Sequence, residues 1–396
     1  MRPTTLHTSQ TAFAGIEARQ TRQSQLQQQL GTGLRVTRPG DDPVAAAQAE
    51  MARSHLARLA QDKRATDLGQ GVLASADDAL AQGVNLLQSA RESLVAAGNG
   101  AYSPGERQAL ALVLRGAREQ LLALANTRDG AGGAVFGGQG TNADPLAGDM
   151  PVWSAPSGVQ RIGEDGRYAA SVDGRSSFMT IPQGNGVFVT ASAAGNTGAG
   201  WIEPGAVADA TQLTGHSLRI DIGGAPGALT YSVQDLDAGI TLVSAQPLPA
   251  DGTLTLQGQR VKVSGTPAPA DAFNVSPAGR QSVFQTLDEA IATLETPMSN
   301  PAYAERLARV QAGIDRALDG MTLTRSQVGQ ALRQVEDAAL AGEDQALAAE
   351  TRRSTLRDLD YASAISDMQN NQTALEAALK AYSSVGRTTL FQLLQG

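Results

Sequence analysis

The sequence predicts an α+β fold in which the N- and C-terminal parts form a long antiparallel helical bundle or coiled coil, with an inserted antiparallel β domain. The prediction depends on two changes of composition along the 396 residues. Residues 1 to about 130 are rich in Ala, Gln and Leu, residues about 137–275 in Gly, Thr, Val and Ser, and residues about 281–396 return to a helical pattern. Because helical segments flank the β segment, the two ends are expected to pack against each other.

The overall composition excludes several classes of protein. Hydrophobic residues make up 41% of the chain but aromatic residues only 4%, so Ala and Leu carry much of the apolar content, as in long helices. A net charge of −8 argues against a general nucleic-acid binder, which would be basic. The absence of Cys excludes disulfides, Cys-ligated zinc and thiol catalysis. The N-terminus lacks the apolar core of a secretory signal, so we expect no cleaved signal peptide.

Apolar residues spaced alternately three and four positions apart predict two long central helices. The stripe of the first helix is Leu73, Ala76, Leu80, Gly83, Leu87, Ala90 and Leu94. The stripe of the second is Leu307, Val310, Ile314, Ala317, Met321, Thr324 and Val328. A shorter helix follows the first, because Ser103 at its N-cap and Glu106 three residues on can form a capping box, with Pro104 in the first turn.

The two ends of the chain are predicted to be helices that bury too little apolar area to stand alone. Residues 20–30 contain six Gln, and a helix over residues 4–30 would be roughly 40 Å long. The last helix carries a stripe with the same spacing, Tyr361, Ile365, Met368, Gln372, Leu375, Leu379 and Tyr382. Since an isolated helix is marginal in water, we expect the first helix to order only when it meets partners, including the C-terminal helix. The alternative is a frayed terminus without a role.

Five segments of alternating hydrophobicity predict β-strands in the central part of the chain. They are residues 186–190, 217–222, 229–233, 253–256 and 259–263. Gly-Gly, Asp-Gly and Pro-Ala pairs between them are turn signals. We therefore expect a small antiparallel β domain, rich in Gly and Thr.

No pattern in the sequence predicts a catalytic or metal site. The three His residues lie far apart, at His7, His55 and His216, and none is in an H-E-x-x-H pattern. Residues 31–33 match a phosphate-binding loop only weakly, because no Gly-Lys-Ser/Thr follows. Asp42 precedes Pro43, which favours an N-cap over a paired-carboxylate site. We expect no enzymatic activity and no cofactor.

Residues 31–46 closely resemble the junction motif of the flagellin superfamily, in which glycines end one helix and an Asp pair starts the next. The residues that carry this match are Gly31, Gly33, Arg35, Asp41, Asp42 and Pro43. Further segments resemble superfamily signatures in the same order along the chain, at residues 126–130, 135–138, 271–275, 325–329, 360–362 and 388–394. Together the matches extend over almost the whole chain except its central domain.

Within the superfamily, three details resemble the hook-associated protein 3 family, the hook–filament junction proteins, more closely than filament flagellin. Pro43 follows the Asp pair where flagellins usually carry Ala. The C-terminal segment, residues 374–394, resembles that of the junction family and lacks the usual flagellin ending. The return strand with Phe273 and the following residues 283–287 also resemble that family.

The resemblance implies a structural role. The chain would be exported through the flagellar type III channel without a cleaved signal and would assemble outside the cell into the ring between hook-associated protein 1 and the filament. Its partners would be hook-associated protein 1, flagellin, neighbouring copies of itself and an export chaperone at the C-terminal helix, but no nucleic acid and no membrane. Two alternatives remain: filament flagellin itself, and a secreted coiled-coil adhesin or effector with a β head.

The resemblance also implies three domains. Residues 1–43 and 355–396 would form a terminal coiled-coil domain that is disordered before assembly. Residues 44–140 and 276–354 would form a helical bundle domain, and residues 141–275 an inserted, β-rich outer domain. The candidate assembly residues, expected to pack between the terminal helices and against adjacent subunits, are Phe13, Ile16, Leu26, Leu30, Tyr361, Ile365, Met368, Leu375, Leu379 and Tyr382.

Overall fold

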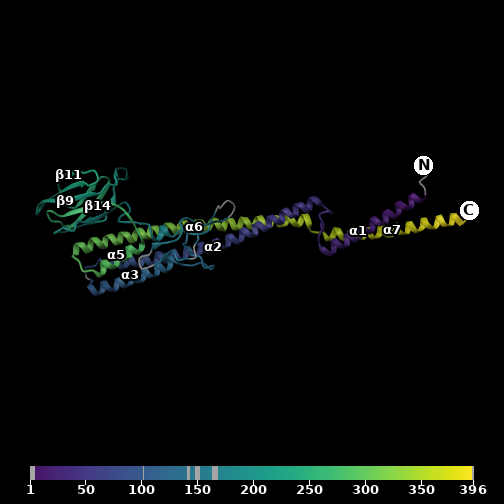
Figure 1. The fold of residues 1–396 in the computed structure, drawn as a ribbon, viewed down its shortest axis with the longest axis horizontal. Coiled ribbons are helices and arrows are strands. Elements are labelled where there is room, and N and C mark those ends of the chain that lie inside the picture. The colour runs from purple at the N-terminus through teal and green to yellow at the C-terminus, as the bar shows by residue number, and fades with distance from the viewer. Residues whose placement is uncertain (1–4, 101, 141–142, 148–151, 163–167, 395–396) are drawn as a thin grey trace. The chain divides into compact units, whose positions relative to one another are not determined.

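The computed structural model describes residues 5–100, 102–140, 143–147, 152–162 and 168–394. The chain forms two compact units. The first comprises residues 1–64 and 339–396, and the second comprises residues 65–338. The predicted α+β class, with long terminal helices and a central antiparallel β part, is confirmed (Figure 1).

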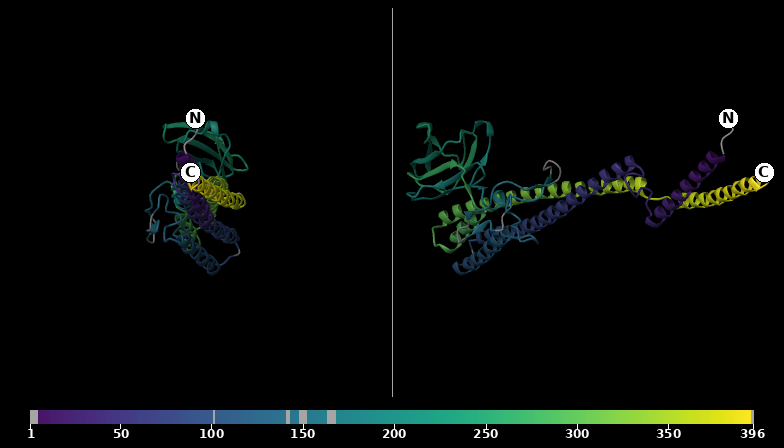
Figure 2. Two further views of the ribbon diagram at one scale, coloured as in Figure 1. Left: turned by 90° about the vertical axis from the view of Figure 1, so that its right-hand side faces the viewer. Right: turned by 45° about the vertical axis from the view of Figure 1, so that its right-hand side comes forward.

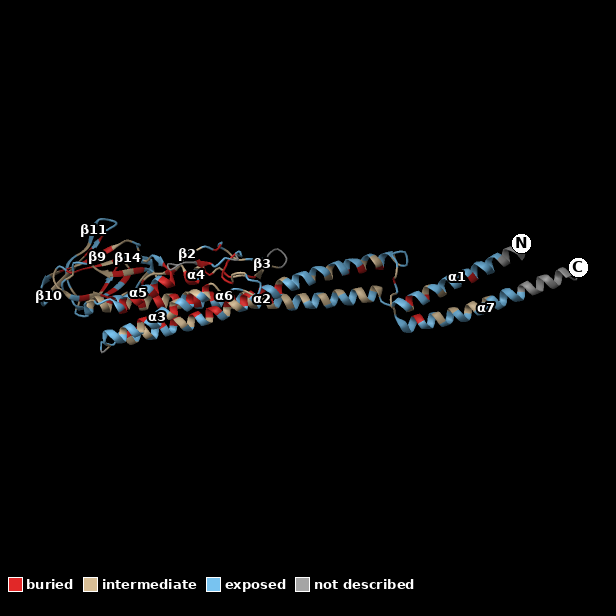
Figure 3. Ribbon diagram, turned by 60° about the horizontal axis from the view of Figure 1, so that its bottom comes forward, coloured by how far each residue is buried: buried red, intermediate tan, exposed pale blue. Residues whose placement is uncertain are grey.

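The first unit is built from four helical segments. It contains α1 (Thr5–Thr32), the start of α2 (Pro43–Ala97), the end of α6 (Asn300–Arg357) and α7 (Tyr361–Leu394). Helices α1 and α7 lie side by side (Figure 2). The Asn371 side chain of α7 donates hydrogen bonds to the Arg19 backbone oxygen, at 2.9 Å, and to Gln23 Oε1, at 3.0 Å. Among residues 10–32 of α1 and 361–384 of α7, most are exposed (Figure 3).

The helical core of the second unit lies among α2, α3 (Pro104–Ala125), α5 (Val283–Glu295) and α6. Every residue of the two predicted central stripes is buried, which confirms both helices. Ion pairs between α2 and α6 lie at the edge of this core, with Arg91–Asp315 at 2.6 Å and Arg325–Asp77 at 2.9 Å. The capping box of Ser103 and Glu106 is also confirmed at the start of α3.

Short elements between α3 and the β domain add side chains to this helical core. These elements are β1 (Leu146–Ala147), β2 (Val152–Trp153), β3 (Arg161–Ile162), β4 (Tyr168–Ala169), α4 (Arg175–Phe178) and β5 (Ile181–Pro182). Phe178 packs edge-on against Phe136, with ring centroids 5.3 Å apart, and also stacks near Phe284 of α5. Leu146 and Val172 are buried in the same cluster. This part of the chain therefore belongs to the core of the helices.

The β part is a sandwich of two antiparallel sheets. One sheet has the order β11-β10-β9-β14-β6, and the other has the order β12-β13-β7, with β8 also paired to β13. The bounds are β6 (Phe188–Ser192), β7 (Ala199–Ile202), β8 (Ala206–Val207), β9 (Leu218–Ala225), β10 (Ala228–Asp235), β11 (Ile240–Pro247), β12 (Thr253–Leu256), β13 (Gln259–Thr266) and β14 (Ala272–Pro277). Phe188, Ile220 and Phe273 are buried between the sheets.

All five predicted strands are found. The bounds of β12 are as predicted, and those of the other four differ by one to three residues. The sequence pattern missed β7, β8 and β11 of the sandwich. Two connections join the sandwich to the helices, and they pair with each other, since β15 (Arg280–Gln281) is antiparallel to β5.

Candidate assembly surface and helix joint

The first half of the junction motif ends α1. Gly33 has φ +71°, a left-handed conformation that strongly favours glycine, and its N–H donates to the Gln29 backbone oxygen at 2.8 Å. The sequence motif predicts that Gly31 also ends the helix. This prediction is wrong, because Gly31 lies inside α1. The helix continues through Gly31 to Thr32, and it ends where Gly33 takes a positive φ.

The second half of the motif starts α2. The Asp41 carboxylate accepts hydrogen bonds from the Arg38 N–H at 2.9 Å and from the Thr37 hydroxyl at 2.8 Å, and these bonds hold the pKa of Asp41 below its usual value. Asp42 caps the helix, because its Oδ1 accepts from the Ala45 N–H at 2.9 Å. That bond, and then the Arg35 guanidinium, lower the pKa of Asp42. The predicted N-cap role of Asp42 is thus confirmed.

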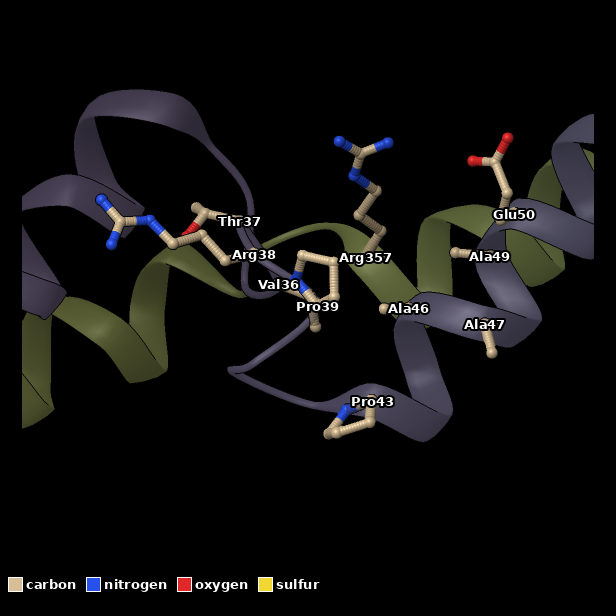
Figure 4. A pocket seen from close by; sticks show the side chains of 10 residues that line it. All are labelled: Val36, Thr37, Arg38, Pro39, Pro43, Ala46, Ala47, Ala49, Glu50 and Arg357. Carbon is tan, nitrogen blue, oxygen red and sulfur yellow. The ribbon is translucent and has the colours of Figure 1, made fainter.

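The same region contains a shallow pocket of about 410 Å³. Val36, Pro39 and Ala46 form part of its apolar lining, and Arg38 and Arg357 extend away from one another beside it (Figure 4). The lining offers no set of groups suited to acid–base or nucleophilic chemistry. Within the described residues, no group of His, Asp and Glu side chains could hold a metal ion. No described helix has an apolar stretch sufficient to traverse a bilayer.

The candidate assembly residues of α1 fall into two groups. Ile16 and Leu26 are buried, Leu26 with only 2% of its surface exposed, and Leu30 is half-buried. Phe13 is exposed, with 56% of its surface accessible. In a helix that pairs with α7, the buried residues stabilise the pair, whereas a large exposed aromatic side chain is available to another molecule.

The candidate residues of α7 divide in the same way. Met368 and Leu375 are half-buried. Four large side chains remain exposed in the single chain, namely Tyr361, Ile365, Leu379 and Tyr382. Two further buried residues, Gln29 of α1 and Ala364 of α7, were not predicted, because neither belongs to the apolar stripes. The α1–α7 pair thus buries part of the candidate set and leaves an apolar remainder on its surface.

Comparison with known families decides the identity of these helical ends. The family model of the bacterial flagellin N-terminal helical region matches residues 4–141. The family model of the bacterial flagellin C-terminal helical region matches residues 311–394. Together the two matches cover more than half of the chain. The chain belongs to the flagellin superfamily.

Within the flagellin superfamily, curated relatives align with the chain from end to end. Flagellar hook-associated protein 3 of Escherichia coli is 26% identical over 398 residues, which cover 99% of each chain. The protein of the same name from Salmonella typhimurium is 27% identical and covers 96% of each chain. The crystal structure of flagellar hook associated protein-3 from Legionella pneumophila has a TM-score of 0.72 at 24% identity, covering 78% of this chain and 98% of that one. That likeness shows a shared fold.

Proposed function

We propose that this chain is a structural subunit of the bacterial flagellum, of the hook-associated protein 3 type, that forms the junction between the hook-associated zone and the flagellin filament. The observation that carries the proposal is the end-to-end similarity to hook-associated protein 3, which includes the outer β part as well as the shared helical ends. The two flagellin-type matches alone, at residues 4–141 and 311–394, would leave filament flagellin as an equal candidate.

The surface of the terminal helices supports assembly by contact between copies. Phe13 of α1 and Ile365, Leu379 and Tyr382 of α7 expose between 41% and 56% of their surface in the single chain. Large exposed apolar side chains on neighbouring helices mark interaction sites in soluble proteins. We infer that adjacent copies cover these residues, and that the chain acts through assembly and has no catalytic activity.

The finer assignments are part of the same proposal. The chain would leave the cell by type III export without a cleaved signal, bound beforehand by a chaperone at α7. It would then contact hook-associated protein 1 on one side and flagellin on the other. Residues 1–43 and 355–396 would form the inner domain, and residues 44–140 and 276–354 the middle domain. The outer domain, expected at residues 141–275, would comprise the sandwich at residues 188–275, because Leu146, Val172 and Phe178 are buried in the helical core. Interruptions of the helices at 33–42 and 358–360 support the inner boundary.

The decisive experiment is the addition of purified chain to flagellar hooks that carry or lack hook-associated protein 1, followed by electron microscopy. We expect a short layer of added density only on hooks that carry hook-associated protein 1. Long filaments formed by the chain alone would identify a filament flagellin. An absence of density on both kinds of hook would contradict a junction role.

A further inference from the structure

Both long helical paths of the chain break at the same level, and the two breaks pair with each other. The first break is residues 33–42, between α1 and α2, and the second is residues 358–360, between α6 and α7. Leu34 and Asp358 form an antiparallel bridge. The Arg35 N–H donates to the Arg357 oxygen at 2.8 Å, and the Leu359 N–H donates to the Gly33 oxygen at 3.0 Å. The two breaks therefore make one joint with two strands.

The Arg35 side chain connects the ends of two helices, α6 and α2, across this joint. One guanidinium nitrogen donates to the Leu356 backbone oxygen at 2.6 Å, in the last turn of α6. Carbonyl groups in that turn have no partner within the helix, so a cation there satisfies one of them and is favoured by the helix dipole. The other nitrogen lies 3.3 Å from Asp42 Oδ2, at the N-cap of α2.

A third helix, α1, holds the backbone of Arg35. The amide nitrogen of Gln29, a buried residue in α1, donates to the Arg35 oxygen at 2.7 Å. Tyr361, the first residue of α7, packs closely on the joint, since a Cβ atom at Gly33 would lie 2.8 Å from its hydroxyl oxygen. Arg35 and its immediate neighbours thus contact the ends of all four helical segments.

Side-chain packing contributes little to this joint. Of residues 33–42, all of which the structure describes, Val36 alone is buried. The pocket beside Val36 and Pro39 leaves the space between the linker and α2 unfilled (Figure 4). Where few apolar contacts hold a segment, its local stability depends on its hydrogen bonds.

We propose that residues 33–42 and 358–360 form a hinge with two coupled strands, and that Arg35 sets its bend. Because the strands are paired, α1 and α7 change direction together relative to residues 43–64 and 339–357. The Arg35 side chain is the element that resists the change, since it links the strand of one break to the helix ends of the other. The hinge requires the paired terminal helices, so it is tested in the chain bound to hooks, and in this respect it rests on the proposed function.

The absence of Cys makes the full-length chain suited to distance measurement between introduced spin labels. One pair of labels, Ala18→Cys with Ala57→Cys, connects α1 to α2. A second pair, Ala377→Cys with Ala341→Cys, connects α7 to α6. All four positions are exposed in the structure. Pulsed electron paramagnetic resonance on the labelled chain, diluted with unlabelled chain and bound to hooks that carry hook-associated protein 1, then gives the width of each distance distribution.

We expect both distributions to be narrow in the otherwise unchanged chain and both to broaden about twofold with Arg35→Ala, since the remaining backbone bridge is a weak local restraint. Arg38→Ala is the matched control, because it removes the same charge from the same linker while Arg35 keeps its contacts. It should change neither width. The proposal is overturned if Arg35→Ala changes neither width, if it broadens only one pair, or if the unchanged chain already gives broad distributions. Circular dichroism checks that helicity is retained.

Discussion

The carboxylate of Glu305 in α6 accepts two hydrogen bonds from Ser192 in β6, one from the backbone N–H at 3.1 Å and one from the hydroxyl group. Glu305 is buried, and the Arg309 guanidinium one helical turn later donates to it at 2.7 Å. The contact between Ser192 and Glu305 therefore connects the outer sandwich to the helical bundle. It is separate from the β5–β15 pair and from the hydrophobic core.

Glu305→Ala should loosen that connection. The substitution takes this partner away from the half-buried N–H and hydroxyl of Ser192 and from Arg309, which costs about 1–3 kcal/mol. We expect faster proteolysis at residues 183–187 and 278–280, measured on the full chain. Asp319→Ala, which removes an exposed ion pair with Arg316 on the same helix, should leave the cleavage rate unchanged. Equal rates in the Glu305 variant and the parent would contradict the connection.

The sandwich should show a pH-dependent stability that depends on His216. Its Nδ1 lies 2.8 Å from Asp235 Oδ2, and this hydrogen bond raises the pKa of His216. The Ala238 N–H, and then His216, lower the pKa of the buried Asp235. Since His titrates near 6.5 in an unfolded chain, its contribution is complete below about pH 6.5 and is lost as the pH rises through the raised value. The Asp235 contribution is present above about pH 4 and is lost as the pH falls through the lowered value.

The measurement is Trp201 fluorescence during thermal unfolding in a Trp153→Phe background. We expect the unfolding midpoint to fall between pH 6 and pH 8, and this fall to disappear in His216→Gln. His55→Gln, a change of the same kind on α2, should keep the fall. A midpoint that responds to pH equally in both variants would show that the His216–Asp235 pair is not responsible.

Two glycines two positions apart should respond in opposite ways to alanine. Gly33→Ala places a Cβ atom at φ +71° and 2.8 Å from the Tyr361 hydroxyl, so it should destabilise the first unit by about 1–2 kcal/mol. Gly31→Ala lies inside α1 with open space around the new Cβ, so it should stabilise the helix by about 0.5–1 kcal/mol. Denaturant unfolding followed by circular dichroism gives both values. Equal effects of the two substitutions would contradict the assigned end of α1.

Substitutions in the terminal helices should distinguish residues that hold α1 and α7 together from residues that contact other subunits. Leu26→Ala removes a side chain that is 2% exposed, and we expect it to cost about 2–3 kcal/mol and to accelerate amide hydrogen exchange in both α1 and α7. Leu379→Asp changes a side chain that is 45% exposed, so exchange in the free chain should be unchanged while binding to hooks is lost. Leu375→Asp changes a half-buried residue, so it should both accelerate amide exchange and abolish binding to hooks.

Gln369→Asp is the control for the added charge, because Gln369 is an exposed polar residue of the same helix. It should leave both exchange and binding unchanged. Normal hook binding by the Leu379 variant would exclude the exposed face of α7 as an assembly surface. In the parent chain, residues of α1 and α7 should exchange faster than the buried residues of α2 and α3, such as Leu80, Leu87 and Leu114. The disorder of residues 1–43 and 355–396 before assembly stays a prediction that this measurement tests. Exchange of both helices at the rate of an unstructured chain would support it and would leave Leu26→Ala without an effect in the free chain.

The helices could be predicted from sequence because each carries a local signal. The Leu80 and Leu87 stripe has a fixed period, and the Ser103–Glu106 pair caps its helix within four residues. The missed strand β11 lies at the edge of its sheet, and six of its eight residues are exposed, so it shows no clean alternation of buried and exposed positions. The elements between Leu146 and Ile181 are too short for any period.

The joint was only half visible in the sequence. The motif drew attention to Arg35 and Asp42, and the N-cap role of Asp42 followed from Pro43 alone. The contact of Arg35 with the Leu356 oxygen joins residues 321 positions apart, and no local pattern encodes such a pair. The link between Glu305 and Ser192 was missed because it also joins residues far apart in the sequence. In addition, a Glu on a helix is usually solvated.

The bridge between Leu34 and Asp358 also sets an order of folding. Closing a loop of this length directly from the unfolded chain is slow and entropically unfavourable. Once α2 and α6 have paired through their central stripes, the same two residues are already neighbours and the remaining loop is short. The first thirty residues can therefore reach their native partner only after the last forty have been synthesised. A shortened chain would lose the structure of both ends when either one is removed.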